Sequence, residues 1–187
     1  SDIDLPDSDS LTVQGDIYEG EAGATVVSGY TATAEVADTA GGNLLARWKR
    51  RLGDEAGMEL QFYVDHTKRD NWSLDEQRTT FDVDWQHYFQ AGELHSLVWG
   101  AGFRRTEDEI SPVAGGVLAF TPAEREDNTF SAFVQDDIAL LDDRVHLIVG
   151  TKVEHNDYTG WEVQPNARVR WDLNDEATVW GSVSRAV

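Results

Sequence analysis

Hydrophobic and polar residues alternate without interruption along residues 161–173, WEVQPNARVRWDL. One set of alternate positions holds Trp161, Val163, Pro165, Ala167, Val169, Trp171 and Leu173, and the positions between them are polar or charged. Successive side chains of a strand point to opposite faces, so this segment is predicted to be a strand with one hydrophobic and one polar face. At about thirteen residues it is longer than most strands of soluble proteins and long enough to cross a bilayer at a tilt.

The same two-residue period recurs along most of the chain. From it we predict about nine long strands, near residues 10–19, 43–52, 57–68, 77–89, 93–107, 127–141, 144–157, 161–173 and 177–187. The predicted fold class is all-β, an antiparallel up-and-down meander of these strands.

The connections between the predicted strands fall into two alternating sets. One set is short and rich in Gly, Asp and Asn, as tight hairpins prefer: residues 53–56, 90–92, 142–143 and 174–176. The other set contains the Gly/Ala/Thr-rich loop 20–42, the proline-containing loop 108–126 and the shorter loops 69–76 and 157–160. Alternate connections of a meander lie at the same end, so one end is predicted to carry tight turns and the other long loops. Outer-membrane β-barrels have this asymmetry.

Composition narrows the class of protein further. The length of 187 residues fits one domain, and 35 acidic against 15 basic residues give a net charge of −20. Such a field repels phosphate, which argues against a nucleic-acid partner. The mean hydropathy is −0.47, and no apolar run approaches the length of a transmembrane helix, whereas a barrel strand needs an apolar residue only at every second position. The absence of cysteine excludes disulfides and thiolate metal sites.

No pattern in the sequence indicates catalysis. The motifs of common hydrolases, metalloproteases and nucleotide-binding proteins are missing, and the histidines lie on separate predicted strands without ligand spacing. We therefore predict no catalytic residue, no metal site and no cofactor, and we expect that the protein is not an enzyme. Asp82 and Asp84 are expected to line the polar face, and Asp142 and Asp143 to form a turn. Asp136 is harder to explain, because its parity places it on the apolar face, where an acid is unfavourable.

Tryptophan is abundant, with seven residues in the chain. Trp48, Trp85, Trp161 and Trp171 lie near strand ends and share the apolar face of their strands. This placement predicts the aromatic girdles that mark the two interfaces of a membrane barrel. Trp72 differs, because it lies in a connection at the long-loop end. We advance it as a hypothetical solute-binding residue; the sequence gives no other binding residue.

A resemblance to a known family rests on an ordered series of motifs. Phe133–Asp137 (FVQDD) is followed by the turn Asp142–Asp143, then by Gly150–Asn156 (GTKVEHN) and Gln164–Arg168 (QPNAR). In this order the motifs resemble the barrel of TonB-dependent outer-membrane receptors, which import iron chelates and similar solutes. The resemblance is clearest from Leu94 to Val187, and the first half of the chain fits the same barrel more loosely.

The resemblance implies part of a larger transmembrane barrel of about 22 strands with a plugged lumen. Residues 1–187 are then expected to be a partial barrel that lacks the plug domain and the closing strands. The implied location is the outer membrane of a Gram-negative bacterium. The implied partners are outer-membrane lipid, an extracellular solute such as a ferric siderophore, a TonB-type energy-transducing protein and the receptor's own plug. Cobalamin, haem, metals and saccharides remain alternative solutes.

A second reading of the residues is a soluble β-barrel or β-sandwich that binds a ligand or a protein. A compact monomer in plain buffer would favour that reading. For the barrel segment we instead expect detergent dependence, or self-association of the isolated chain through its open strand edges.

Overall fold

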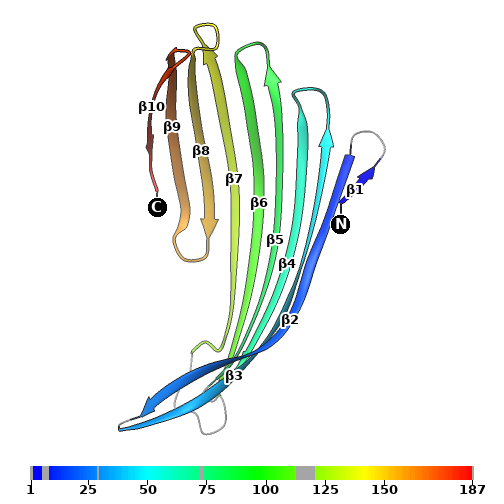
Figure 1. The fold of residues 1–187 in the computed structure, drawn as a ribbon, viewed down its shortest axis with the longest axis vertical. Coiled ribbons are helices and arrows are strands. Elements are labelled where there is room, and N and C mark those ends of the chain that lie inside the picture. Colours follow the sequence, from blue (N-terminus) through cyan, green and yellow to red (C-terminus); the bar gives the residue numbers. More distant parts are fainter. Residues whose placement is uncertain (1, 6–8, 29, 72–73, 113–120, 187) are drawn as a thin grey trace.

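The computed structural model describes residues 2–5, 9–28, 30–71, 74–112 and 121–186. They form one antiparallel sheet of ten strands whose spatial order follows the chain (Figure 1). The strands are β1 (Asp2–Leu5), β2 (Asp9–Ser28), β3 (Thr31–Arg51), β4 (Gly57–Asp70), β5 (Leu74–Ala91), β6 (His95–Pro112), β7 (Glu124–Leu140), β8 (Val145–Asn156), β9 (Gly160–Asn174) and β10 (Ala177–Ser184). The predicted meander of nine long strands is confirmed, and the short β1 adds a tenth.

The sheet is curved and open, with β1 and β10 at its two edges (Figure 1). All the described strands belong to this one sheet, so a β-sandwich, which packs two sheets face to face, is the wrong description of the fold. No helix in the described part of the chain is long and apolar enough to cross a membrane.

Tight turns lie at one end of the sheet, as predicted from their composition. They connect β3 to β4, β5 to β6, β7 to β8 and β9 to β10, at the upper end in Figure 1. In the β7–β8 turn, Leu141, Asp142 and Asp143 have positive φ angles of 54°, 53° and 66°. Aspartate tolerates this left-handed conformation better than most residues, which explains the acidic pair at this turn.

The opposite end differs from the prediction, because residues 20–42 are not a loop. β2 and β3 pair continuously from Asp9↔Arg50 to Ser28↔Thr31, whereas β3 pairs with β4 only as far as Asp38↔Asp70. The remainder is a two-stranded ribbon that extends past the neighbouring strands (Figure 1). The residues of this stretch are mostly small, so their sequence shows no clear alternation of hydrophobic and polar side chains. The two strands can still pair, because strand pairing uses hydrogen bonds of the backbone. The predicted loop 108–126 is shorter at both ends, because β6 continues to Pro112 and β7 begins at Glu124.

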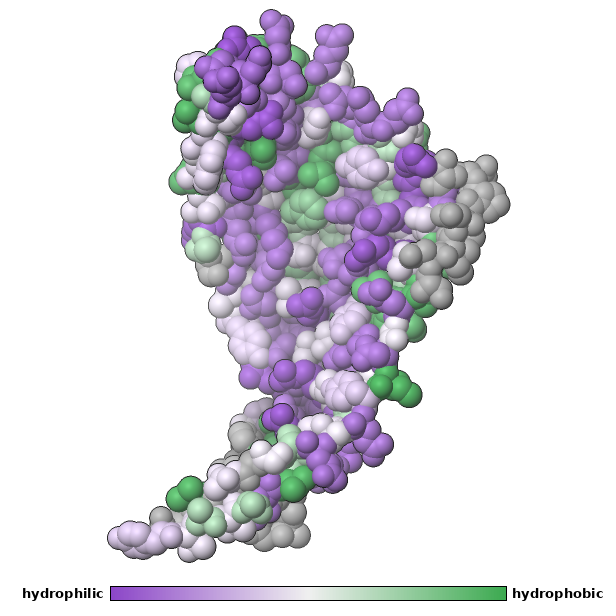
Figure 2. Space-filling view, in the orientation of Figure 1, coloured by the Kyte–Doolittle hydropathy of each residue, from purple (hydrophilic) through white to green (hydrophobic). Residues whose placement is uncertain are grey.

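The strand register separates an apolar face from a polar face. Directly paired residues share a face, and Leu60↔Trp85, Phe62↔Val83 and Val64↔Phe81 continue the apolar face from strand to strand. Hydrophilic residues predominate in the view of Figure 2, with hydrophobic side chains showing between them. No hydrophobic side chain among the described residues is buried. The apolar face therefore has no protein layer over it, and its burial requires an apolar medium or another protein.

Candidate functional site

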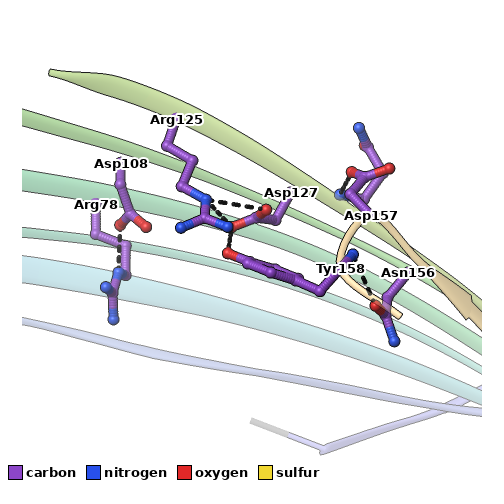
Figure 3. Close-up of polar contacts among 8 residues, drawn as sticks. Arg78, Asp108, Arg125, Asp127, Asn156, Asp157 and Tyr158 are labelled. Carbon is purple, nitrogen blue, oxygen red and sulfur yellow. Dashed lines mark hydrogen bonds and ion pairs between the residues drawn. The ribbon is translucent and has the colours of Figure 1, made fainter. Parts of the chain in front are cut away.

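A row of polar side chains crosses the polar face near the long-loop end (Figure 3). Arg78 on β5 pairs with Asp108 on β6, which in turn pairs with Arg125 on β7. Asp127 of β7 and Tyr158 of the β8–β9 turn lie beside Arg125. We call Arg78, Asp108, Arg125, Asp127 and Tyr158 the mouth cluster.

Direct contacts fix the side chains of the mouth cluster. Arg78 Nε donates a hydrogen bond to Asp108. The guanidinium of Arg125 lies over the ring of Tyr158, 4.1 Å from its centroid, and its Nε is 3.3 Å from Asp127. Tyr158 Oη donates to Asp127 Oδ2 at 2.6 Å. The cluster thus combines two cations, two carboxylates and a phenol, which can donate to and accept from a polar solute.

The β8–β9 turn is held in place by its own side chains and by β7. Asn156 Oδ1 accepts the backbone N–H of Tyr158 at 3.0 Å and that of Thr159 at 2.8 Å. Asp157 Oδ2 accepts the backbone N–H of Asn128, on β7, at 2.8 Å. These bonds position Tyr158 above Asp127, and the hydrogen bond to Asp127 raises the pKa of the Tyr158 phenol above its ordinary value.

A second polar group lies further along the polar face, in a recess of ≈ 260 Å³ between β5 and β8. Asp82 and Asp84 both line it, as their parity predicted. Asp82 is buried, at 7% exposure, and accepts a hydrogen bond from Arg104 Nε at 2.7 Å. Lys152 Nζ donates to Glu154 at 2.7 Å on the same wall. Asp82 is therefore neutralised by a residue of the neighbouring strand, and Lys152 by a residue of its own strand.

The register also explains the carboxylate that the sequence left unexplained. Asp136 lies on the apolar face, as parity predicted, and its Oδ2 accepts a hydrogen bond from His95 Nδ1 at 2.6 Å. The two residues are 41 positions apart in the chain, so only the strand pairing brings them together. The alternation in the sequence places Asp136 on the apolar face, but it does not indicate that His95 is its partner.

The predicted girdle residues lie where parity placed them. Trp48 pairs with Leu60 and Leu60 with Trp85, while Trp161 pairs with His155 and Trp171 with Val145, all on the apolar face. Trp72, the hypothetical solute-binding residue, lies outside the described residues. Within the described ranges, no group of three or more His, Asp or Glu side chains is placed to hold a metal ion.

Comparison with known proteins gives a consistent picture. Residues 2–187 match the family model described as TonB dependent receptor-like, beta-barrel. Among solved structures, the chain is similar to the alcaligin outer membrane receptor FauA from Bordetella pertussis, with TM-score 0.69 and 16% identity over 97% of this chain and 33% of that one. It is also similar to the siderophore receptor PirA from Pseudomonas aeruginosa, with TM-score 0.61 and 13% identity over 99% of this chain and 40% of that one.

At these identities the two structural likenesses show the fold alone. No curated protein matches the chain in sequence. The chain spans between a third and two-fifths of the length of the solved structures that it resembles.

Proposed function

Since this chain belongs to the TonB-dependent receptor β-barrel family, we propose that it forms one section of the barrel wall of a receptor in the outer membrane of a Gram-negative bacterium. The family consists of transport receptors and is not an enzyme family. In the complete receptor, further strands would close the barrel and a plug domain would fill its lumen. The polar face would line that lumen, and the apolar face would contact lipid.

The observation that carries this proposal is that the sheet has one apolar and one polar face. It also has tight turns at one end and longer connections at the other. The apolar face has no buried hydrophobic side chain in the described ranges, which suits a lipid environment and not water. The polar face carries the mouth cluster at the long-loop end, which would face the outside of the cell. A solute arriving from outside would meet the mouth cluster before it reached the lumen.

For the solute we propose an iron–siderophore complex. The supporting observation is that one of the two similar structures is named a siderophore receptor and the other an outer membrane receptor for alcaligin. Import would draw its energy from a TonB-type partner on the periplasmic side. The mouth cluster would contribute to capture, because Arg125, Asp127 and Tyr158 present donors and acceptors in a fixed arrangement. Trp72 stays a predicted solute contact, to be tested by the same assay.

Uptake of radioactive ferric siderophores tests the proposal directly. Iron-starved cells would be compared with and without the complete receptor, and with and without a functional TonB partner. We expect uptake that needs both proteins. Uptake of ferric siderophores that is independent of the receptor would contradict the solute class, while uptake independent of TonB would contradict the energy source.

The contribution of the mouth cluster is tested by substitution within the complete receptor. Arg125→Ala removes the cation above Tyr158 and the ion pair with Asp127, and is expected to weaken solute binding by about tenfold, the effect of one lost charge-assisted contact. Arg105→Ala is the matched control, because Arg105 lies on the opposite face. Equal affinities of the two variants would exclude the cluster from the binding site.

A further inference from the structure

The polar face carries a row of carboxylates directly beside the mouth cluster. The strand register places Asp16 of β2 in line with Asp65 of β4 and Asp127 of β7. This row lies two residues from the mouth cluster on the tight-turn side, a distance of about 7 Å along the strands. We call it the carboxylate row, and it consists of Asp16, Asn43, Asp65, Thr80, Thr106 and Asp127. The row thus contains acids and neutral polar residues but no cation.

Asp16 and Asp65 have only neutral donors beside them. Asn43 Nδ2 donates a hydrogen bond to Asp16 Oδ1 at 2.6 Å, and Tyr63 Oη donates to Asp65 Oδ1 at 3.3 Å. In the part of the chain that the structure describes, neither carboxylate forms an ion pair. Asp16 is exposed and Asp65 is half-buried, so a solute on the polar face can approach both. Their negative charges therefore act on the solute without an adjacent cation to offset them.

The cations near the carboxylate row already have acidic neighbours. Both arginines of the mouth cluster form ion pairs with carboxylates of the same cluster. On the tight-turn side of the row, Arg104 forms an ion pair with Asp82 at 2.7 Å. On the long-loop side of the cluster, Arg69 of β4 lies directly opposite Glu76 of β5. Among the described residues at this end of the polar face, every cation therefore has an acid beside it, and the acids outnumber the cations.

A solute held at the mouth cluster experiences a net negative field from this wall. The carboxylate row is about 7 Å away and the Debye length at physiological ionic strength is about 8 Å, so salt screens the row only in part. Such a field slows the association of an anion but not that of an uncharged molecule. The hydroxyl groups of Thr80 and Thr106 can also donate hydrogen bonds to the oxygen atoms of an uncharged solute.

We propose that the mouth cluster and the carboxylate row select iron chelates without net negative charge, of the trishydroxamate class, over anionic chelates of the tris-catecholate class. A hydroxamate loses one proton when it binds the ferric ion, and a catechol loses two. Three hydroxamates therefore neutralise the ion, whereas three catecholates leave the complex an anion. The anion would meet carboxylates and no free cation on this wall. The inference rests on the function proposed above and adds the charge class of the solute to it.

The test measures binding of two small panels of chelates, ferric trishydroxamates and ferric tris-catecholates, to the purified complete receptor. Quenching of the intrinsic tryptophan fluorescence gives the affinities. We expect at least one trishydroxamate to bind about tenfold more tightly than any tris-catecholate. Because the repulsion is electrostatic, the difference should shrink as the salt concentration rises.

Substitutions in the carboxylate row connect the selectivity to this wall. Asp65→Asn and Asp16→Asn remove one charge each and keep an oxygen that can accept from Tyr63 and from Asn43. Each should reduce the preference for the trishydroxamate about threefold, and the double variant about tenfold, by improving the binding of tris-catecholates. Asp75→Asn is the matched control, because Asp75 lies at the same end of the sheet but on the opposite face. It should leave the preference unchanged.

The outcomes separate failure of the charge selection from failure of the proposed function. A receptor that binds tris-catecholates as tightly as trishydroxamates would overturn the charge selection alone. A preference that survives in the Asp16→Asn, Asp65→Asn double variant would do the same. A receptor that binds neither class would also overturn the charge selection, and if cells with this receptor take up no ferric siderophore, the proposed solute is wrong as well.

Discussion

Trp161 and Trp171 lie on the same face of β9, with Val163, Pro165, Ala167 and Val169 on that face between them. At about 3.4 Å per residue, their separation is about 34 Å along the strand. A strand tilt of about 45° reduces this to about 24 Å along the membrane normal, close to the roughly 25 Å height of the apolar band in membrane barrels. In the proposed membrane placement, this one strand would therefore span the apolar band and carry a tryptophan at each interface.

This placement predicts which tryptophans contact lipid. Trp171 lies on the apolar face, whereas Trp180 of β10 pairs with Arg170 on the polar face. In the complete receptor in bilayers of brominated lipid, the lipid should quench the fluorescence of Trp171, so the emission lost in Trp171→Phe should be the quenched part. The emission lost in Trp180→Phe should be a part that brominated lipid does not quench. Similar quenching at both positions, measured by steady-state fluorescence, would contradict the assignment of the two faces.

Gly100 is predicted to be intolerant of a side chain. It lies on β6 opposite Phe133 of β7, and a Cβ at Gly100 would be 2.7 Å from Cε1 of that ring and in conflict with the carbonyl oxygen of Trp85. We expect Gly100→Ala to lower the free energy of unfolding by about 1–3 kcal/mol, as overpacking does. The measurement is urea unfolding of the complete receptor.

Gly23→Ala is the control for this experiment. Gly23 also lies within a strand, in the part of β2 that extends past β4, and a Cβ there would meet nothing within 4 Å. Its replacement should leave the unfolding transition nearly unchanged. If both variants unfold alike, the contact between Gly100 and the ring of Phe133 is not what restricts the position.

The strands were predictable because each is governed by its own two-residue period. The alternation over residues 161–173 identified β9, which spans Gly160–Asn174. The pair Asp142–Asp143 identified the turn between β7 and β8. The prediction of a loop over residues 20–42 was wrong for a physical reason. Their ladder with β2 is built from backbone hydrogen bonds, and glycine, alanine and threonine carry too weak a hydrophobic signal to mark its period.

The contacts of Asp136 and of the mouth cluster could be predicted only in part, because they depend on how neighbouring strands are aligned. The parity of Asp136 was readable from β7 alone, but its bond to His95 requires the alignment of β6 with β7. The mouth cluster likewise joins Arg78 to Asp108 across 30 residues. A single sequence fixes which face a side chain takes. It does not fix which residue of the next strand lies opposite.

Arg104 and Arg105 are predicted to differ in their contribution to stability. Arg104 neutralises Asp82, whose side chain is only 9% exposed, whereas Arg105 pairs with the exposed Glu107 and Glu126. Arg104→Ala leaves a desolvated carboxylate without its partner and should cost about 1–3 kcal/mol of unfolding free energy. Arg105→Ala should cost about 0–1 kcal/mol, the range for surface ion pairs. Urea unfolding of the two variants provides the comparison, and equal losses would count against a desolvated Asp82.

Tyr158 is predicted to titrate above the ordinary pKa of a phenol. The hydrogen bond to Asp127 is the main cause of the raised pKa, burial adds to it, and the Arg125 cation opposes it. A pKa raised in the folded state favours the protonated phenol. Its contribution to stability is therefore complete below the ordinary pKa and is lost as the pH rises through the raised value.

Ultraviolet absorbance of the phenolate measures this titration, and Tyr158→Phe identifies its signal among the tyrosines. Asp127→Ala removes the acceptor and leaves Arg125 above the ring, so the pKa of Tyr158 should fall. Asp157→Ala is the matched control, because Asp157 neighbours Tyr158 in the chain but bonds to the backbone of Asn128. A Tyr158 pKa that is unchanged by Asp127→Ala, or lowered equally by both substitutions, would show that the hydrogen bond to Asp127 does not control the phenol.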